Sequence, residues 1–242
     1  MSESKINFYL NDKQVEANND ETIWQVANRL GTEIPHLCYA DKPGYRADGN
    51  CRACMVEIEG ERVLAASCVR KPSSDMKVQT TSDKAKKSRE LVFELLLADQ
   101  PERDVAHDNN SHFWNWIDKV DVKENRFPKK TPCQPDSSHP SMAVNLDACI
   151  QCNLCVRACR EVQVNDVIGM AYRGENSKIV FDFDDPMGDS SCVACGECVQ
   201  ACPTGALMPA TLVNENGIGQ SDVDKKVKSV CPYCGVGCQI EY

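Results

Sequence analysis

The chain has 242 residues and a formal net charge of −9 at neutral pH, from 36 acidic and 27 basic residues. This acidity, with no basic stripe, argues against a nucleic-acid partner. The mean hydropathy is −0.43, and no apolar run approaches the roughly 18 residues of a transmembrane helix, so we expect no membrane span. A hydrophobic content of 42% with 13 Gly and 12 Pro excludes collagen-like, coiled-coil and disordered classes.

Sixteen cysteines are the most unusual feature of the composition. The start, Met1 to Lys5, contains no apolar segment, so we expect no signal peptide and a cytoplasmic location. Thiols stay reduced in the cytoplasm, and so many in one chain indicate metal centres rather than disulfides. The cysteines form three sets of four, one isolated residue and a final set of three.

Residues 1–80 predict a small α+β domain. Alternating apolar residues over 6–17 predict a β-hairpin, and helical spacing over 23–30 predicts a helix, with Asn19 or Asp20 as its N-cap. A second hairpin is expected over 54–68. This order of strand, strand, helix, loop, strand and strand is that of a β-grasp domain.

Four dispersed cysteines lie in the loop and the second hairpin of that domain. They are Cys38, Cys51, Cys54 and Cys68. Their spacing resembles that of plant-type ferredoxins. Residues 6–80 resemble the 2Fe-2S domain at the start of the large iron-sulfur subunit of respiratory NADH dehydrogenase and of related hydrogenases and formate dehydrogenases. The resemblance implies a 2Fe-2S cluster on these four residues, with a zinc site as the alternative.

Residues 81–117 predict a helical segment. In the same family, this segment carries one histidine and three cysteines for a further 4Fe-4S cluster. The corresponding positions here hold Gln100, Asp104, His107 and Phe113. The resemblance therefore covers the scaffold and not the ligands. We interpret His107 and His112 as surface histidines and the aromatic residues of 113–116 as apolar filling, and we expect no metal between residues 71 and 130.

Residues 118–142 predict a linker, because they are rich in Lys, Pro and Ser. Cys133 lies inside this segment and has no C-x2-C partner. We expect it to be a spare thiol rather than a ligand.

Residues 143–215 contain the motif C-x2-C-x2-C-x3-C twice, with a small β insertion expected between the copies over 162–185. Three thiolates of such a loop wrap one cubane, while the fourth, one turn into the next helix, ligates the other cluster. The predicted ligands are therefore Cys149, Cys152, Cys155 and Cys202 for one 4Fe-4S cluster, and Cys192, Cys195, Cys198 and Cys159 for the other.

Residues 146–207 resemble the bacterial two-cluster ferredoxins. Arg160 follows the first motif where proline is commoner, and this departure changes no ligand. A pair of structural zinc sites is the alternative, since all-cysteine zinc sites also use C-x2-C pairs.

Residues 216–242 end in C-x2-C-x3-C, formed by Cys231, Cys234 and Cys238. This stretch resembles the opening of molybdopterin-dependent oxidoreductases, most closely formate dehydrogenases. In that family a fourth cysteine follows later, and the cluster lies beside a molybdenum or tungsten bis-pterin cofactor. The resemblance implies a truncated or split chain, whose further 4Fe-4S cluster and pterin cofactor belong to a longer parent chain. A zinc knuckle or free thiols, or completion by Cys133 or by a residue from a partner, are the alternatives.

The resemblances imply an α+β electron relay with one 2Fe-2S and two 4Fe-4S clusters. Its partners would be a pterin-containing catalytic domain or subunit and a flavin- and NAD-binding subunit of the diaphorase type. The sequence contains no dinucleotide, Walker or nucleophile-elbow motif, so we do not expect catalysis by this chain alone. The alternatives are a stand-alone polyferredoxin subunit of a hydrogenase or NADH-linked complex and a zinc-stabilised interaction module.

Overall fold

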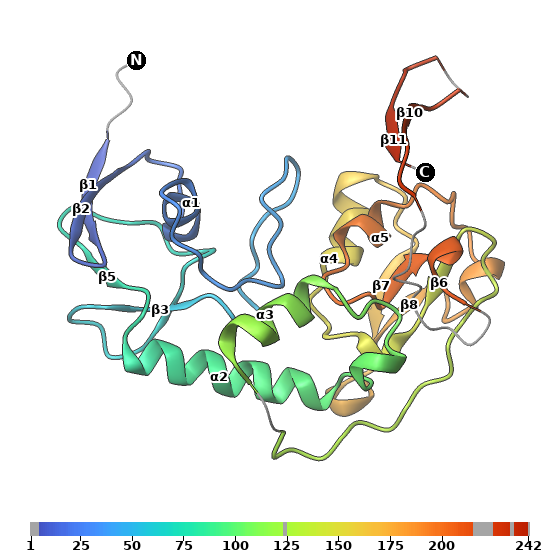
Figure 1. Ribbon diagram of the computed structural model, residues 1–242, viewed down its shortest axis with the longest axis horizontal. Coiled ribbons are helices and arrows are strands. Elements are labelled where there is room, and N and C mark those ends of the chain that lie inside the picture. Colours follow the sequence, from blue (N-terminus) through green and yellow to red (C-terminus); the bar gives the residue numbers. More distant parts are fainter. Residues whose placement is uncertain (1–4, 123–124, 215–224, 233–234, 242) are drawn as a thin grey trace.

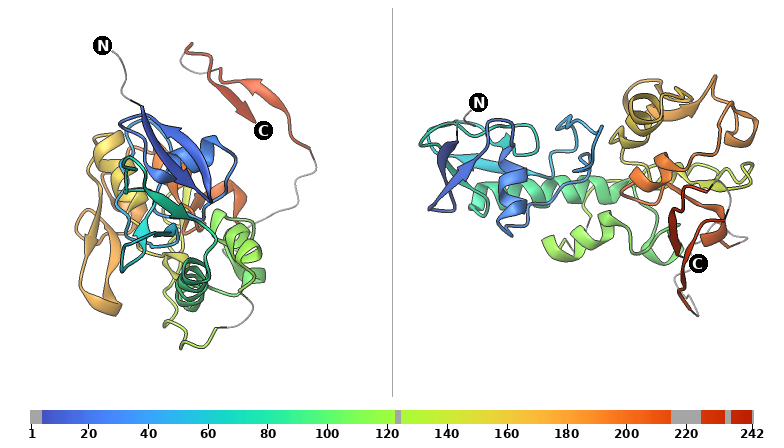
Figure 2. Two further views of the ribbon diagram at one scale, coloured as in Figure 1. Left: turned by 90° about the vertical axis from the view of Figure 1, so that its left-hand side faces the viewer. Right: turned by 90° about the horizontal axis from the view of Figure 1, so that it is seen from above.

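Two lobes, a long connecting helix and a C-terminal hairpin make up the chain (Figure 1). This arrangement comes from a computed structural model that describes residues 5–122, 125–214, 225–232 and 235–241. The lobes lie at opposite ends of the molecule when it is viewed from above (Figure 2). Among the described residues, no helix is long and apolar enough to cross a membrane.

The first lobe is built on a five-stranded sheet with the order β2-β1-β5-β3-β4. Its strands are β1 (Ile6–Leu10), β2 (Lys13–Ala17), β3 (Met55–Ile58), β4 (Ala65–Ala66) and β5 (Lys77–Gln79). Both predicted hairpins are present, as the antiparallel pairs β1–β2 and β3–β4. Strand β5 was not predicted, because three residues are too few to show alternation. It lies between β1 and β3 and joins the two hairpins into one sheet.

Helix α1 (Ile23–Arg29) packs its apolar face into the core of this lobe. Its N-cap is Thr22, so the prediction of Asn19 or Asp20 was wrong. The Thr22 side chain accepts from the backbone of Gln25, whose side chain accepts from the backbone N–H of Thr22. This reciprocal capping box satisfies two free backbone donors, which a cap further upstream would leave unpaired.

Helix α2 (Asp83–Ala98) runs beneath both lobes and ties them together (Figure 1). Near its middle, the buried guanidinium of Arg89 donates twice to the Met55 carbonyl, at 3.0 and 2.7 Å. Just beyond its end, the Gln100 amide donates to the Ala148 carbonyl at 3.0 Å. The two contacts hold the helix to the first sheet and the chain just beyond it to a cysteine loop of the second lobe.

Helix α3 (His112–Val120) packs beside α2 and ends past residue 118, where we predicted the linker to begin. Aromatic residues of the two helices form a small core between the lobes. Phe93 of α2 and Phe113 of α3 are fully buried there, with their ring centroids 6.2 Å apart.

The second lobe is made of short elements around the repeated cysteine motif. Its helices are α4 (Leu154–Arg157), continued by a π-helical turn η3 (Ala158–Val162), and α5 (Glu197–Ala201). Its strand pairs are β6 (Met142–Val144) with β9 (Leu207–Pro209), and β7 (Ile168–Ala171) with β8 (Lys178–Phe181). The pair β7–β8 is the predicted insertion.

Short 3-10 turns complete the described chain, together with a C-terminal hairpin. The turns are η1 (Arg103–Val105), η2 (Leu146–Ala148), η4 (Gly174–Asn176), η5 (Met187–Asp189) and η6 (Ala210–Leu212). The hairpin pairs β10 (Lys228–Val230) with β11 (Gln239–Glu241).

The core between the lobes predicts a stability contrast on one helix. Phe93→Ala should lower the free energy of unfolding by about 3–5 kcal/mol, because it leaves a cavity in a fully buried site. Leu95→Ala, on the same helix but at a residue 50% exposed, should change it by less than about 0.5 kcal/mol. Anaerobic denaturant unfolding followed by circular dichroism measures both. Equal losses in the two variants would contradict this account of the core.

Candidate metal centres

The first cysteine set converges between the sheet and the loop that follows α1. The sulfurs of Cys54 and Cys68 lie 3.3 Å apart. Hydrogen bonds from the thiols of Cys51 and Cys68 lower the pKa of Cys38, and the Cys51 backbone N–H lies 3.4 Å from the Cys38 sulfur. The loop after α1 and the second hairpin thus bring four thiols into one group, three of them buried and Cys51 half-buried.

A glycine shapes the loop that carries Cys51. Gly49 has a φ of +63°, in the left-handed region that favours glycine. A Cβ at this position would also lie 2.9 Å from a methyl carbon of Val69, next to Cys68. The loop therefore closes over the hairpin because residue 49 has no side chain.

The second set lines one cavity in the second lobe. Its four cysteines are Cys149, Cys152, Cys155 and Cys202. Apolar neighbours such as Ile179 and Leu207 line the same cavity. Burial raises the pKa of Cys149 to about 11 and that of Cys152 further. A cation among these sulfurs would favour their thiolate forms.

The third set lines a separate cavity. Its four cysteines are Cys159, Cys192, Cys195 and Cys198. Each cavity thus combines three cysteines of one motif copy with the last cysteine of the other copy. The Val167 backbone N–H lies 3.3 Å from the Cys159 sulfur, and the Ala194 N–H lies 3.4 Å from that of Cys192. Such N–H donors stabilise negative charge on sulfur.

The internal repeat extends to the backbone of the two loops. Gln151 and Asn153 have positive φ in the first copy, and Ala194 and Gly196 have positive φ at the equivalent positions of the second. Asn153 and Gly196 directly precede α4 and α5. The repeated left-handed turns fold both loops in the same way, with the third cysteine of each motif at the start of a helix.

The three sets differ in their exposure to solvent. Cysteines of the first two sets are buried or half-buried, whereas Cys195 of the third set is exposed. Val164 and Val193, which lie near that set in sequence, are also exposed. The third set is therefore the one that reaches the surface.

The segment over 81–117 fills the space between the lobes with side chains. Phe113 is fully buried, as expected for apolar filling. His107 is only 1% exposed, so its interpretation as a surface histidine was wrong, while His112 is exposed. Burial lowers the pKa of His107 and favours its neutral form. Only the tertiary fold buries this polar stretch, and no sequence pattern indicates it.

The remaining cysteines lie apart from the three sets. Cys133 is half-buried, and its backbone N–H donates to Asp147. The C-terminal hairpin brings Cys231 and Cys238 together, and the Cys231 backbone N–H donates to the Cys238 carbonyl at 2.8 Å. Cys234 lies outside the described residues. None of the fifteen described cysteines forms a disulfide.

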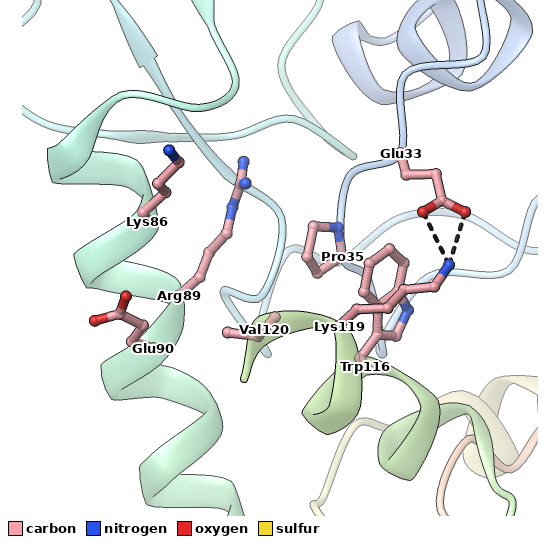
Figure 3. Close-up of a pocket in the computed structure, with 8 residues that line it drawn as sticks. All are labelled: Glu33, Pro35, Lys86, Arg89, Glu90, Trp116, Lys119 and Val120. Atoms are coloured by element: carbon pink, nitrogen blue, oxygen red, sulfur yellow. Dashed lines mark hydrogen bonds and ion pairs between the residues drawn. The ribbon is translucent and has the colours of Figure 1, made fainter. Parts of the chain in front are cut away.

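A groove of 460 Å³ lies away from these sets, between the loop that follows α1 and helices α2 and α3 (Figure 3). Three of its charged side chains already have partners. Glu33 accepts from Lys119 at 2.7 and 2.9 Å, and Arg89 is bound to the Met55 carbonyl. Its lining contains no cysteine, and it offers no donor set for a metal centre.

The donor sets fit iron-sulfur clusters. Each contains four thiols, and N–H donors approach the sulfurs. Among the described residues, no three His, Cys, Asp or Glu side chains lie close enough to share a single metal ion. A cluster instead places several irons between its four cysteines. That these twelve residues are the ligands remains a prediction.

Comparison with protein families identifies three iron-sulfur segments. A 2Fe-2S iron-sulfur cluster binding domain matches residues 3–83, and a 4Fe-4S dicluster domain matches residues 148–206. The molybdopterin oxidoreductase Fe4S4 domain matches residues 224–242. The predicted fold class, an α+β chain with a 2Fe-2S domain followed by a two-cluster domain, is confirmed.

The chain spans about a quarter of the length of the two curated relatives described first below. One subunit of an NADH-quinone oxidoreductase of Rhizobium meliloti is 30% identical over 96% of the chain and 27% of that protein. A putative formate dehydrogenase of Staphylococcus haemolyticus is 27% identical over 87% of the chain and 25% of that protein. The crystal structure of an NAD+-reducing [NiFe]-hydrogenase matches with a TM-score of 0.77 and 25% identity, over 85% of this chain and 88% of the other.

The fourth cysteine of each repeated motif lies with the other copy's cysteines, and this exchange predicts which cluster a substitution removes. Cys202→Ala should remove about four irons and the 4Fe-4S signal of the Cys149 loop, while the cluster of the Cys192 loop persists. Cys133→Ala should leave the iron content unchanged. Iron analysis and electron paramagnetic resonance (EPR) of anaerobic protein measure both. Loss of the cluster of the Cys192 loop in Cys202→Ala would contradict the pairing.

Proposed function

We propose that this chain, which carries the iron-sulfur domains found in the N-terminal regions of formate dehydrogenases and of NADH-quinone oxidoreductase and hydrogenase subunits, is an electron relay. One observation carries the proposal. A single buried core contains a cysteine from each of the three sets, including Cys38, Cys152 and Cys198. Three redox centres that share one core are neighbours, as a relay requires.

The proposed centres are one 2Fe-2S cluster on the first set and one 4Fe-4S cluster on each of the other two. When bound, such clusters accept and release single electrons. The order of the centres follows from their neighbours. Arg157 donates to the carbonyls of both Cys38 of the first set and Cys152 of the second, and helix α4 of the second set packs against helix α5 of the third. The second set is therefore the middle of the relay.

The residues of the chain hold, shield and tune these centres. The apolar wall of the second-set cavity shields its thiols from water, which strengthens the electrostatic interactions inside it. Backbone N–H groups that point at the cysteine sulfurs stabilise the added negative charge on reduction. The two lobes keep the first and second sets in fixed proximity through α2 and the contacts that hold it to both lobes.

The parent system that the relatives support is a formate dehydrogenase. In it, this relay would connect a pterin-containing domain with a flavin- and NAD-binding subunit in the cytoplasm. Formate would yield carbon dioxide, a proton and two electrons, which would leave singly through the relay and reduce NAD+. The terminal cysteines would belong to a further 4Fe-4S cluster beside the molybdenum or tungsten pterin in a longer chain. The match of residues 224–242 to a molybdopterin oxidoreductase domain supports this parent.

The alternative is a polyferredoxin subunit of a hydrogenase or NADH-linked complex. The similarity to an NAD+-reducing hydrogenase supports it. The two proposals differ in the use of the terminal hairpin, since a carrier without a pterin domain does not need the C-x2-C-x3-C motif.

Metal analysis combined with a reductive titration tests the relay. Anaerobically purified protein should contain about 10 irons with matching sulfide, and no zinc, molybdenum or tungsten. Stepwise addition of dithionite should transfer about three electrons per chain, one for each cluster, and air-free ferricyanide should recover them. A colourless protein that holds zinc and takes up no electrons would contradict the proposal and favour an interaction module.

A further inference from the structure

A buried arginine joins the first and second cysteine sets. Arg157 lies at the end of α4 and is only 2% exposed. One of its terminal nitrogens, Nη2, donates to the Cys38 carbonyl at 2.7 Å and to the Cys152 carbonyl at 3.3 Å. One cationic nitrogen therefore bonds to the backbone of one cysteine from each of two neighbouring sets.

The other nitrogens of the guanidinium also bind residues at the boundary between the lobes, where the loop of the first set meets the cysteine loop before α4. Nη1 donates to the Arg46 carbonyl in the loop of the first set. Nε donates to the Asn153 carbonyl at 3.3 Å and lies 3.3 Å from a carboxylate oxygen of Asp48. The planar fork of arginine suits this arrangement, because it directs several N–H donors at fixed angles. A lysine presents a single point charge and does not match it.

The charge at this boundary is only partly compensated. Four of the partners are neutral backbone carbonyls, and the one anionic partner, Asp48, also pairs with Arg46. Arg46 is 64% exposed and bridges to Glu161 on η3. The boundary thus contains a buried cation and an exposed one, of which only the exposed one is screened strongly by water.

We infer that Arg157 is a positioning residue that couples the first two centres of the proposed relay and raises the reduction potentials of both. The inference rests on the proposed clusters. A positive charge stabilises the reduced, more negative form of each cluster, and in a buried site its effect falls off slowly with distance. The shared nitrogen also fixes the separation between the two cysteine loops. Arg157 donates to no residue of the third set, so that centre serves as an internal reference.

Redox potentiometry followed by EPR tests this inference on the whole chain. Arg157→Gln removes the charge and should disfavour reduction of the first and second centres at least about tenfold, which is about 59 mV for one electron. The equilibrium constant for reduction of the third centre should change by less than about threefold. Arg157→Lys keeps the charge and should restore most of the potential. Asp48→Asn should shift the same two centres in the opposite direction.

The matched control is Arg46→Gln, which removes the exposed cation of the same boundary and should leave all three potentials within about threefold of the parent chain. Unchanged potentials in Arg157→Gln with intact clusters would overturn the inference, as would equal shifts at all three centres or in Arg46→Gln. If Arg157→Gln does not assemble its clusters, the opposite shift in Asp48→Asn decides the matter. A parent chain without clusters would instead overturn the proposed function.

Discussion

The contact between the loop of the first cysteine set and the cysteine loop of the second lobe is the constraint on which this structure depends. Two lobes that each bury a set of thiols form a relay only if these sets lie against each other. Arg157 and the Asn50 amide both donate to the Cys152 carbonyl from opposite sides of the boundary. Tyr45 adds a hydrogen bond of 2.7 Å to Glu197, beside Cys198.

The rest of the fold supports this contact. Strand β5 joins two hairpins into one sheet and so fixes the position of the 54–68 hairpin, which carries two cysteines of the first set. Helix α2 then spans the distance between the lobes, and the aromatic core of α2 and α3 fills the space between them. This core helps to hold the lobes in place, because close packing resists displacement.

Local spacing predicted the parts of this protein that depend on a few neighbouring residues. The two C-x2-C-x2-C-x3-C motifs predicted which cysteines would surround each cavity, because a short loop can wrap a cluster in only one way. The first hairpin and the β7–β8 insertion follow from simple alternation. Strand β5, the burial of His107 and the cap at Thr22 depend on tertiary packing or on competition between local hydrogen bonds, and they were missed. The role of Arg157 was also missed, since its partners at Cys38 and Arg46 are more than one hundred residues away.

The central claim is that the first two centres are neighbours across the boundary between the lobes. It is tested most directly by EPR of the fully reduced protein, through the magnetic interaction between clusters. We expect the signal of the 2Fe-2S centre to be broadened by the 4Fe-4S centre of the Cys149 loop, and to sharpen when Cys202→Ala removes that centre. A 2Fe-2S signal that is the same in both proteins would show magnetically isolated lobes and contradict the account.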